Sequence, residues 1–192
     1  MNLSDYKFYL ASKSPRRRKL LKLLQIRFKS FSVNLEEQIT DGEHPVKTVK
    51  RLALEKMNAA RKKVNDGIII TADTIVVLDK KIIGKPENPK DAERILKLLS
   101  GKRHFVYTGF SIFNPFNNKQ LVDYEKTAVY FHELTNAEIR KYVLSGSPLD
   151  KAGAYGIQDD FGAVFIKKIN GCYYNVVGLP ISKLYKRLLE IL

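Results

Sequence analysis

Two serines and a run of cations stand where a helix is expected to begin. In LASKSPRRRKLLKLL, residues 10–24, Ser14 suits the N-cap and a proline follows it. Arg16 and Arg17 come next, although a helix N-terminus is already partly positive and disfavours cations. A bound polyphosphate would offset this charge, because backbone N–H groups, guanidinium groups and the hydroxyls of Ser12 and Ser14 all donate to phosphate oxygens. The alternative is a solvated basic turn with Ser14 as a plain cap, and the spacing alone does not decide.

A carboxylate follows the most apolar run of the chain. The run IIIT, residues 68–71, predicts a strand buried on both faces, and Asp73 comes directly after it. Strand ends in α/β sheets present site residues, and a carboxylate there binds magnesium or accepts a proton from water. The alternative is that Asp73 caps a turn. Lys85, between Gly84 and Pro86, is expected on a constrained loop one hairpin further on.

A lysine interrupts the apolar stripe of the long helix expected over residues 44–64. Lys56 is four residues from both Leu52 and Ala60, so it lies on or beside the stripe. Its ammonium group either extends to the edge of the stripe to reach solvent or contacts an anion in a cleft.

A flexible loop carries polar groups near the C-terminal end. In DKAGAYGIQDDFGA, residues 150–163, small residues surround Lys151, Tyr155 and Gln158. Such a loop lets backbone approach a flat ligand closely. The Gln158 amide has one acceptor and two donors, which suits the edge of a nucleobase. Tyr155 could stack on a base, but a tyrosine in such a position is more often part of the core.

Helical and strand patterns alternate along the chain, which predicts an α/β fold with a mixed sheet in a single domain over residues 1–192. Strands are expected at 7–11, 28–34, 68–71, 75–78, 81–83, 105–113, 120–130, 163–169 and 173–177. Helices are expected from Ser14, over 44–64, from Asn88 to Ser100, over 135–145 and over 180–191. The last two strands are predicted to form a hairpin across Asn170-Gly171.

Composition excludes several classes of protein. The net charge of +14 comes from 34 basic and 20 acidic residues. Its lysines are spread over the whole chain without a known nucleic-acid-binding motif, so no stable nucleic-acid partner is expected. No apolar run approaches the roughly 18 residues of a membrane span, and no signal peptide is expected. The single cysteine, Cys172, excludes an internal disulfide and fits a cytoplasmic location.

Six stretches together resemble the Maf family of nucleoside triphosphate pyrophosphatases. They are LASKSPRR, LALEKMNAAR, TADTIVVLDKKIIGKP, DAERILKLLSGKRHFVYTG, YVLSGSPLDKAGAYGIQ and YYNVVGLP, in family order over nearly the whole chain. The resemblance implies a long mixed sheet with flanking helices and two lobes around a cleft, similar to the inosine triphosphate pyrophosphatases. It also implies hydrolysis of the α–β phosphoanhydride with a divalent metal, usually magnesium, with manganese or cobalt as alternatives.

The resemblance assigns roles by position. Asp73 matches the family's catalytic carboxylate and a metal ligand, and Glu36 or Glu37 matches a second acidic position, with Glu36 preferred as metal ligand. The implied substrate-binding residues are Ser12, Arg16, Arg17, Lys56, Lys85 and Lys151.

The resemblance also implies a substrate. Arg16, Thr74 and Gln158 are similar to the subfamily acting on dTTP and UTP, and modified pyrimidine nucleotides are included in this expectation. Family members often form homodimers. The alternative function is a basic protein that binds nucleic acid or regulates septum formation and cell division without catalysis.

Overall fold

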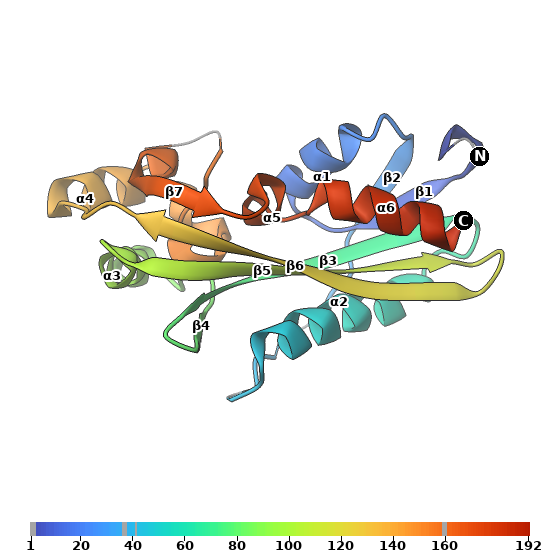
Figure 1. Ribbon diagram of the computed structural model, residues 1–192, viewed down its shortest axis with the longest axis horizontal. Coiled ribbons are helices and arrows are strands. Elements are labelled where there is room, and N and C mark those ends of the chain that lie inside the picture. The colour runs from blue at the N-terminus through green and yellow to red at the C-terminus, as the bar shows by residue number, and fades with distance from the viewer. Residues whose placement is uncertain (1–2, 36–37, 41, 159–160) are drawn as a thin grey trace. The chain divides into compact units, whose positions relative to one another are not determined.

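A mixed seven-stranded sheet with helices organises the chain in the computed structural model, which describes residues 3–35, 38–40, 42–158 and 161–192 (Figure 1). The strands are β1 (Phe8–Ala11), β2 (Phe28–Phe31), β3 (Ile68–Leu78), β4 (Lys81–Ile83), β5 (Arg103–Asn114), β6 (Lys119–Phe131) and β7 (Ile166–Asn170). Their order is β2-β1-β3-β5-β6-β7, and β4 pairs with β3. β1 pairs in parallel with both β2 and β3, whereas β3–β4 and β6–β7 are antiparallel. The predicted mixed sheet is confirmed.

Six α-helices and four short 3₁₀ helices are found among the described residues. The α-helices are α1 (Pro15–Lys22), α2 (Pro45–Arg61), α3 (Pro89–Leu99), α4 (Asn136–Leu144), α5 (Tyr173–Val177) and α6 (Ile181–Ile191). The 3₁₀ helices are η1 (Leu3–Asp5), η2 (Ser147–Asp150), η3 (Ala152–Ala154) and η4 (Phe161–Phe165). Of the helices in this part of the chain, none is both long and apolar enough to cross a membrane.

The chain divides into two compact units, and each contains segments from distant parts of the sequence. The first unit has residues Met1–Asp73, Thr108–Glu125 and Gly178–Leu192. The second unit has residues Thr74–Tyr107 and Lys126–Val177.

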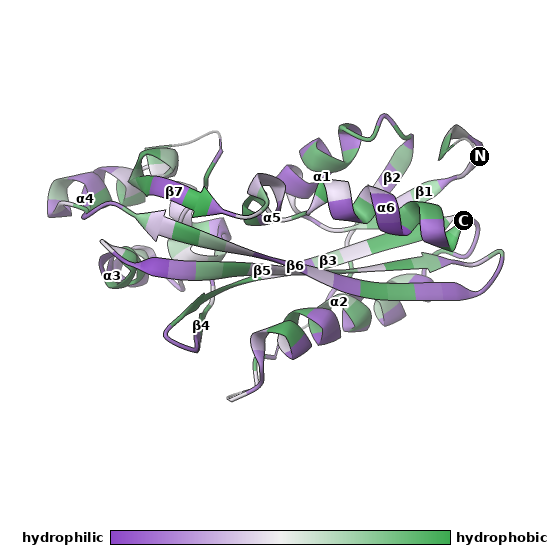
Figure 2. Cartoon of the chain, in the orientation of Figure 1, coloured by the Kyte–Doolittle hydropathy of each residue, from purple (hydrophilic) through white to green (hydrophobic). Residues whose placement is uncertain are grey.

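In the first unit, the apolar stripe of α2 is buried as its spacing predicts. Leu52, Ala53, Met57 and Ala60 are almost fully buried, and polar residues alternate with apolar ones along the helix (Figure 2). The Thr71 hydroxyl on β3 donates to the Ala53 carbonyl at 2.7 Å, which ties the helix to the strand.

In the second unit, helix caps fall where the sequence predicts them. The Asn88 side chain caps α3 by accepting from the Asp91 N–H, and Thr135 with Glu138 forms the expected capping box of α4. Gly101 ends α3 with φ +68°, a left-handed conformation that glycine adopts without steric cost. The Asn88 and Thr135 caps satisfy N–H groups that the helices leave without internal partners.

Three predictions about the elements are wrong. β3 runs without a break through residues 68–78, so Asp73 lies inside a strand rather than beyond its end. Residues 173–177 form helix α5 instead of the second arm of a hairpin. Asn175, which is fully buried, explains this helix, because its amide donates to the Val106 carbonyl and to the Thr127 hydroxyl at 3.0 and 2.9 Å. Residues 163–165, expected as strand, belong to η4.

At Gly109 on β5, α2 packs closely against the sheet. A Cβ at this position would stand 2.2 Å from the Val49 carbonyl oxygen, so the helix could not keep its place. We predict that Gly109→Ala lowers the free energy of unfolding by about 3 kcal/mol in urea titrations. The control is Gly84→Ala, whose added Cβ meets no atom within 4 Å and should change stability by no more than about 0.5 kcal/mol. Equal stabilities of the two variants would contradict this packing.

Candidate active site

The predicted start of the first helix is confirmed in the first unit. The Ser14 hydroxyl caps α1 by accepting from the Arg17 N–H at 3.4 Å, and the Ser14 N–H donates to the Ser12 hydroxyl at 3.2 Å. Ser12 is buried, and Arg16 and Arg17 are half-buried. The Arg17 Nε donates to the Gly178 carbonyl at 2.9 Å, which fixes the guanidinium group beside the helix start.

Lys56 and Asp73 form a buried ion pair. The Lys56 ammonium on α2 donates to the Asp73 carboxylate on β3, and the two side chains are 10% and 7% exposed. In this structure the Lys56 ammonium contacts an anion of the protein itself, the Asp73 carboxylate. Binding of a ligand anion by Lys56 stays a prediction. Removal of either partner would leave the other charge buried without compensation, so the fold depends on both.

The strand register brings this pair to the level at which β1 leads into the start of α1. Leu10 on β1 pairs with Ile70 on β3 in a parallel ladder. Two residues beyond that pair stand Ser12 on one chain segment and Ala72 on the other, and Asp73 follows at once. The loop that leads into α1 therefore leaves β1 at the level where β3 reaches Asp73.

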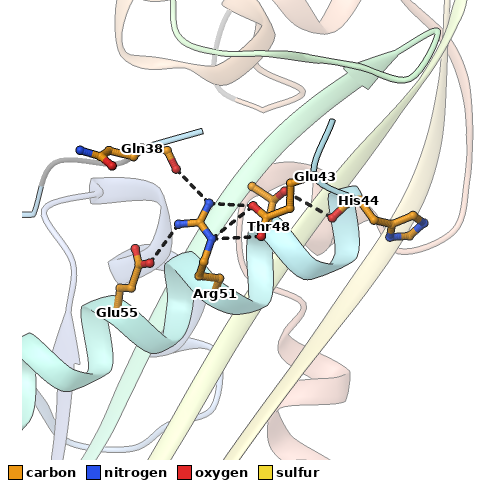
Figure 3. Close-up of polar contacts among 6 residues, drawn as sticks. All are labelled: Gln38, Glu43, His44, Thr48, Arg51 and Glu55. Atoms are coloured by element: carbon orange, nitrogen blue, oxygen red, sulfur yellow. Dashed lines mark hydrogen bonds and ion pairs between the residues drawn. The ribbon is translucent and has the colours of Figure 1, made fainter. Parts of the chain in front are cut away.

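A charged network, which the sequence did not predict, surrounds Arg51 on α2 (Figure 3). Its guanidinium group donates to both Glu43 oxygens at 2.7–3.2 Å, to Glu55 at 2.9 Å and to the Gln38 carbonyl at 2.9 Å. The Arg51 hydrogen bonds hold the pKa of Glu43 below its usual value. Only the spacing of Arg51 and Glu55, four residues apart on a helix, hinted at any part of this network.

The remaining predicted site residues lie in the second unit. Lys85 is exposed, and Thr74 and Gln158 are half-buried. Lys151 is buried, and its ammonium donates to the Ser147 hydroxyl and to Asp150, both at 2.9 Å. The loops of Lys85 and Lys151 are joined, because the Gly153 N–H donates to the Gly84 carbonyl at 3.0 Å.

The number of acidic side chains available bears on which kind of metal site this protein could form. Within the described residues, no group of three or more His, Cys, Asp or Glu side chains is arranged to hold a metal ion. Magnesium binds through one or two carboxylates, waters and substrate phosphates, so Asp73 is a sufficient kind of protein ligand. Glu36 and Glu37, the other predicted acidic position, lie outside the described residues.

Comparison with known proteins identifies the family. A family model described as "Maf-like protein" matches residues 7–191. The chain belongs to the Maf-like protein family. This result confirms the resemblance drawn from the six sequence stretches.

Relatives of this Maf-like protein cover nearly its whole length. A protein of Syntrophomonas wolfei named dTTP/UTP pyrophosphatase is 48% identical over 92% of this chain and 93% of the relative. A protein of Aquifex aeolicus with the same name is 47% identical over 95% of this chain and 94% of the relative. Among solved structures, a HAM1 protein from Coxiella burnetii covers 96% of this chain and 99% of its own, with 14% identity and a TM-score of 0.51. That likeness concerns the fold alone and confirms the predicted fold class.

The predicted site residues of this Maf-like protein thus form two sets. Ser12, Arg16, Arg17, Lys56 and Asp73 belong to the first unit, and Thr74, Lys85, Lys151 and Gln158 belong to the second. The boundary between the units falls between Asp73 and Thr74, within β3. Their convergence on one ligand stays a prediction.

Removing the Lys56 ammonium should leave the buried Asp73 carboxylate without its charge partner. We predict that Lys56→Met lowers the free energy of unfolding by about 3–5 kcal/mol, and that adding Asp73→Asn recovers much of the loss because no uncompensated charge remains. Urea titration of the single and double variants measures both effects.

The control for this pair is Arg94→Met. Arg94 pairs with Asp91 at 2.7 Å but is 67% exposed, and exposed pairs contribute at most about 1 kcal/mol. A Lys56→Met loss no greater than that of Arg94→Met would show that the buried pair does not stabilise the fold.

Proposed function

We propose that this Maf-like protein hydrolyses the α–β phosphoanhydride of dTTP and UTP to the nucleoside monophosphate and pyrophosphate. The observation that carries the proposal is the name dTTP/UTP pyrophosphatase on relatives 44–48% identical over more than nine-tenths of this chain. The ion pair of Lys56 and Asp73 lies at the level where β1 leads into α1, and it supplies charged groups of the right chemistry.

The cations bind the triphosphate. Guanidinium groups form paired hydrogen bonds with phosphate oxygens, whereas ammonium groups act as point charges. In this proposal Arg16 and Arg17 bind at the start of α1 with the Ser12 hydroxyl, and Lys56, Lys85 and Lys151 neutralise the remaining oxygens. Stabilising the negative charge that develops on the leaving pyrophosphate supplies most of the acceleration.

Asp73 is the proposed catalytic carboxylate. Either directly or through a bound metal, it activates the water that attacks in line with the bond to be cleaved. Lys56, which neutralises Asp73 in this structure, turns to the phosphates when substrate binds, and this frees the carboxylate for its catalytic role.

A divalent metal, magnesium or alternatively manganese or cobalt, is the proposed cofactor, with Asp73 and Glu36 as its protein ligands. When bound, such an ion neutralises phosphate charge and lowers the pKa of a coordinated water.

Specificity is proposed to come from Arg16, Thr74 and Gln158. A uracil or thymine ring offers an imide N–H between two carbonyl groups, and the Gln158 amide complements that edge with one acceptor and two donors. Modified pyrimidine nucleotides share this edge and belong to the same proposal. A cytoplasmic location and assembly as a homodimer also stay expectations.

The test is pyrophosphate release from a panel of nucleoside triphosphates with magnesium. We predict release from dTTP and UTP, and a loss of about 10²–10³-fold in Asp73→Asn, because one charged group at the reacting centre is removed. Circular dichroism of the variant checks that it is folded. Wild-type turnover in Asp73→Asn would exclude Asp73 as the catalytic carboxylate. If the intact protein releases no pyrophosphate from any nucleotide, the proposed activity is wrong.

A further inference from the structure

Hydrogen bonds fix the segment between Lys151 and Gln158, in the second unit, at four consecutive residues, 153–156. The Gly153 N–H donates to the Gly84 carbonyl and the Ala154 N–H donates to the Lys151 carbonyl, both at 3.0 Å. Gly153 and Ala154 have φ of +73° and +58°. An alanine in this left-handed region is strained, so the surroundings must hold the backbone in place.

Tyr142 secures the next part of the segment. Its ring is buried on α4, and its hydroxyl accepts from the Gly156 N–H at 3.2 Å. Gly156 is itself buried, so this N–H would otherwise be without a partner in the protein interior. The hydrogen bond thus anchors the backbone two residues before Gln158.

A third anchor joins Tyr155 to His104. The Tyr155 hydroxyl and the His104 Nε2 are 2.7 Å apart, and both residues are buried. Phe131 packs edge-on against both rings, with centroids 4.8 and 4.9 Å away. Burial lowers the pKa of His104 to about 4, so the imidazole is neutral at pH 7 and this contact carries no net charge.

We propose that Tyr142 and Tyr155 are positioning residues that hold Gln158 for base recognition. This inference rests on the proposed function. It adds two buried residues of the second unit to those that determine base selectivity. A polar site rejects the wrong base only when its donors and acceptors are held in place, because a loose amide would rotate to suit either base. Neither tyrosine is proposed to contact the phosphates. Removing either hydroxyl should therefore reduce discrimination between bases more than it reduces the rate of the chemical step.

The experiment compares Tyr142→Phe, Tyr155→Phe and Gln158→Ala in pyrophosphate release from dTTP, UTP and dCTP with magnesium. Each tyrosine variant keeps its ring and loses one hydroxyl. We expect the ratio of kcat/KM for dTTP over dCTP to fall about tenfold in Tyr142→Phe, which leaves a buried N–H unpaired, and severalfold in Tyr155→Phe. The change should lie in KM for dTTP, with kcat nearly unchanged. In Gln158→Ala the ratio of kcat/KM for dTTP over dCTP should fall at least as far as in Tyr142→Phe.

The matched control is Tyr9→Phe in the first unit. The buried Tyr9 ring also has a hydrogen-bonded hydroxyl, which donates to Asp66 at 2.7 Å. This variant measures what loss of a tyrosine hydroxyl does to stability in general, and it should keep the wild-type ratio between dTTP and dCTP. Amide hydrogen exchange over residues 152–158 gives a second readout, and it should be faster in Tyr142→Phe and Tyr155→Phe than in wild type or Tyr9→Phe.

The outcomes separate this inference from the proposed function. If Gln158→Ala loses discrimination while both tyrosine variants keep it, the inference is wrong and the proposed function stands. If Gln158→Ala keeps discrimination, recognition by Gln158 is wrong and the inference fails with it. If the wild-type protein releases no pyrophosphate, the proposed function fails first, and unchanged exchange over residues 152–158 would independently overturn the positioning role.

Discussion

The ion pair between Lys56 and Asp73 places two opposite charges in an interior where neither would be stable alone. It joins α2 to the central strand β3 in the first unit, at the level where β1 leads into α1. A purely structural contact could use two apolar side chains of similar size, which are often at least as stabilising as a buried ion pair. A charged pair at this position is therefore more easily explained if the bound substrate gives each of the two side chains a new partner of opposite charge. A magnesium-bound triphosphate offers both, because its oxygens attract the ammonium group and its metal attracts the carboxylate.

Much of the fold could be predicted from local patterns. The helix caps at Ser14, Asn88 and Thr135 fall where the sequence places them, because a capping side chain bonds backbone only two or three residues away. The apolar stripe of α2 was equally clear, since helix period and burial coincide. The position of Lys56 on that stripe was also predictable, but the spacing did not decide between contact with solvent and contact with an anion.

The parts that could not be predicted depend on contacts between distant residues. The sequence predicts that Asp73 follows a strand, yet β3 continues beyond it because β4 pairs with the later residues. The helix at residues 173–177 depends on the Asn175 hydrogen bonds to Val106 and Thr127, which no local pattern contains. The network of Arg51 and the anchors of Tyr142 and Tyr155 are of the same kind. Of the candidate site, the residue types were predictable, but the pairing of Lys56 with Asp73 required the fold.

The most direct measurement is a crystal structure of the protein with magnesium and a dTTP analogue whose α–β bridging oxygen is replaced by an imido group. The account predicts that the Lys56 ammonium leaves Asp73 to contact a phosphate oxygen, while the Asp73 carboxylate faces the metal. A nucleotide bound away from both residues, with their ion pair intact, would contradict it.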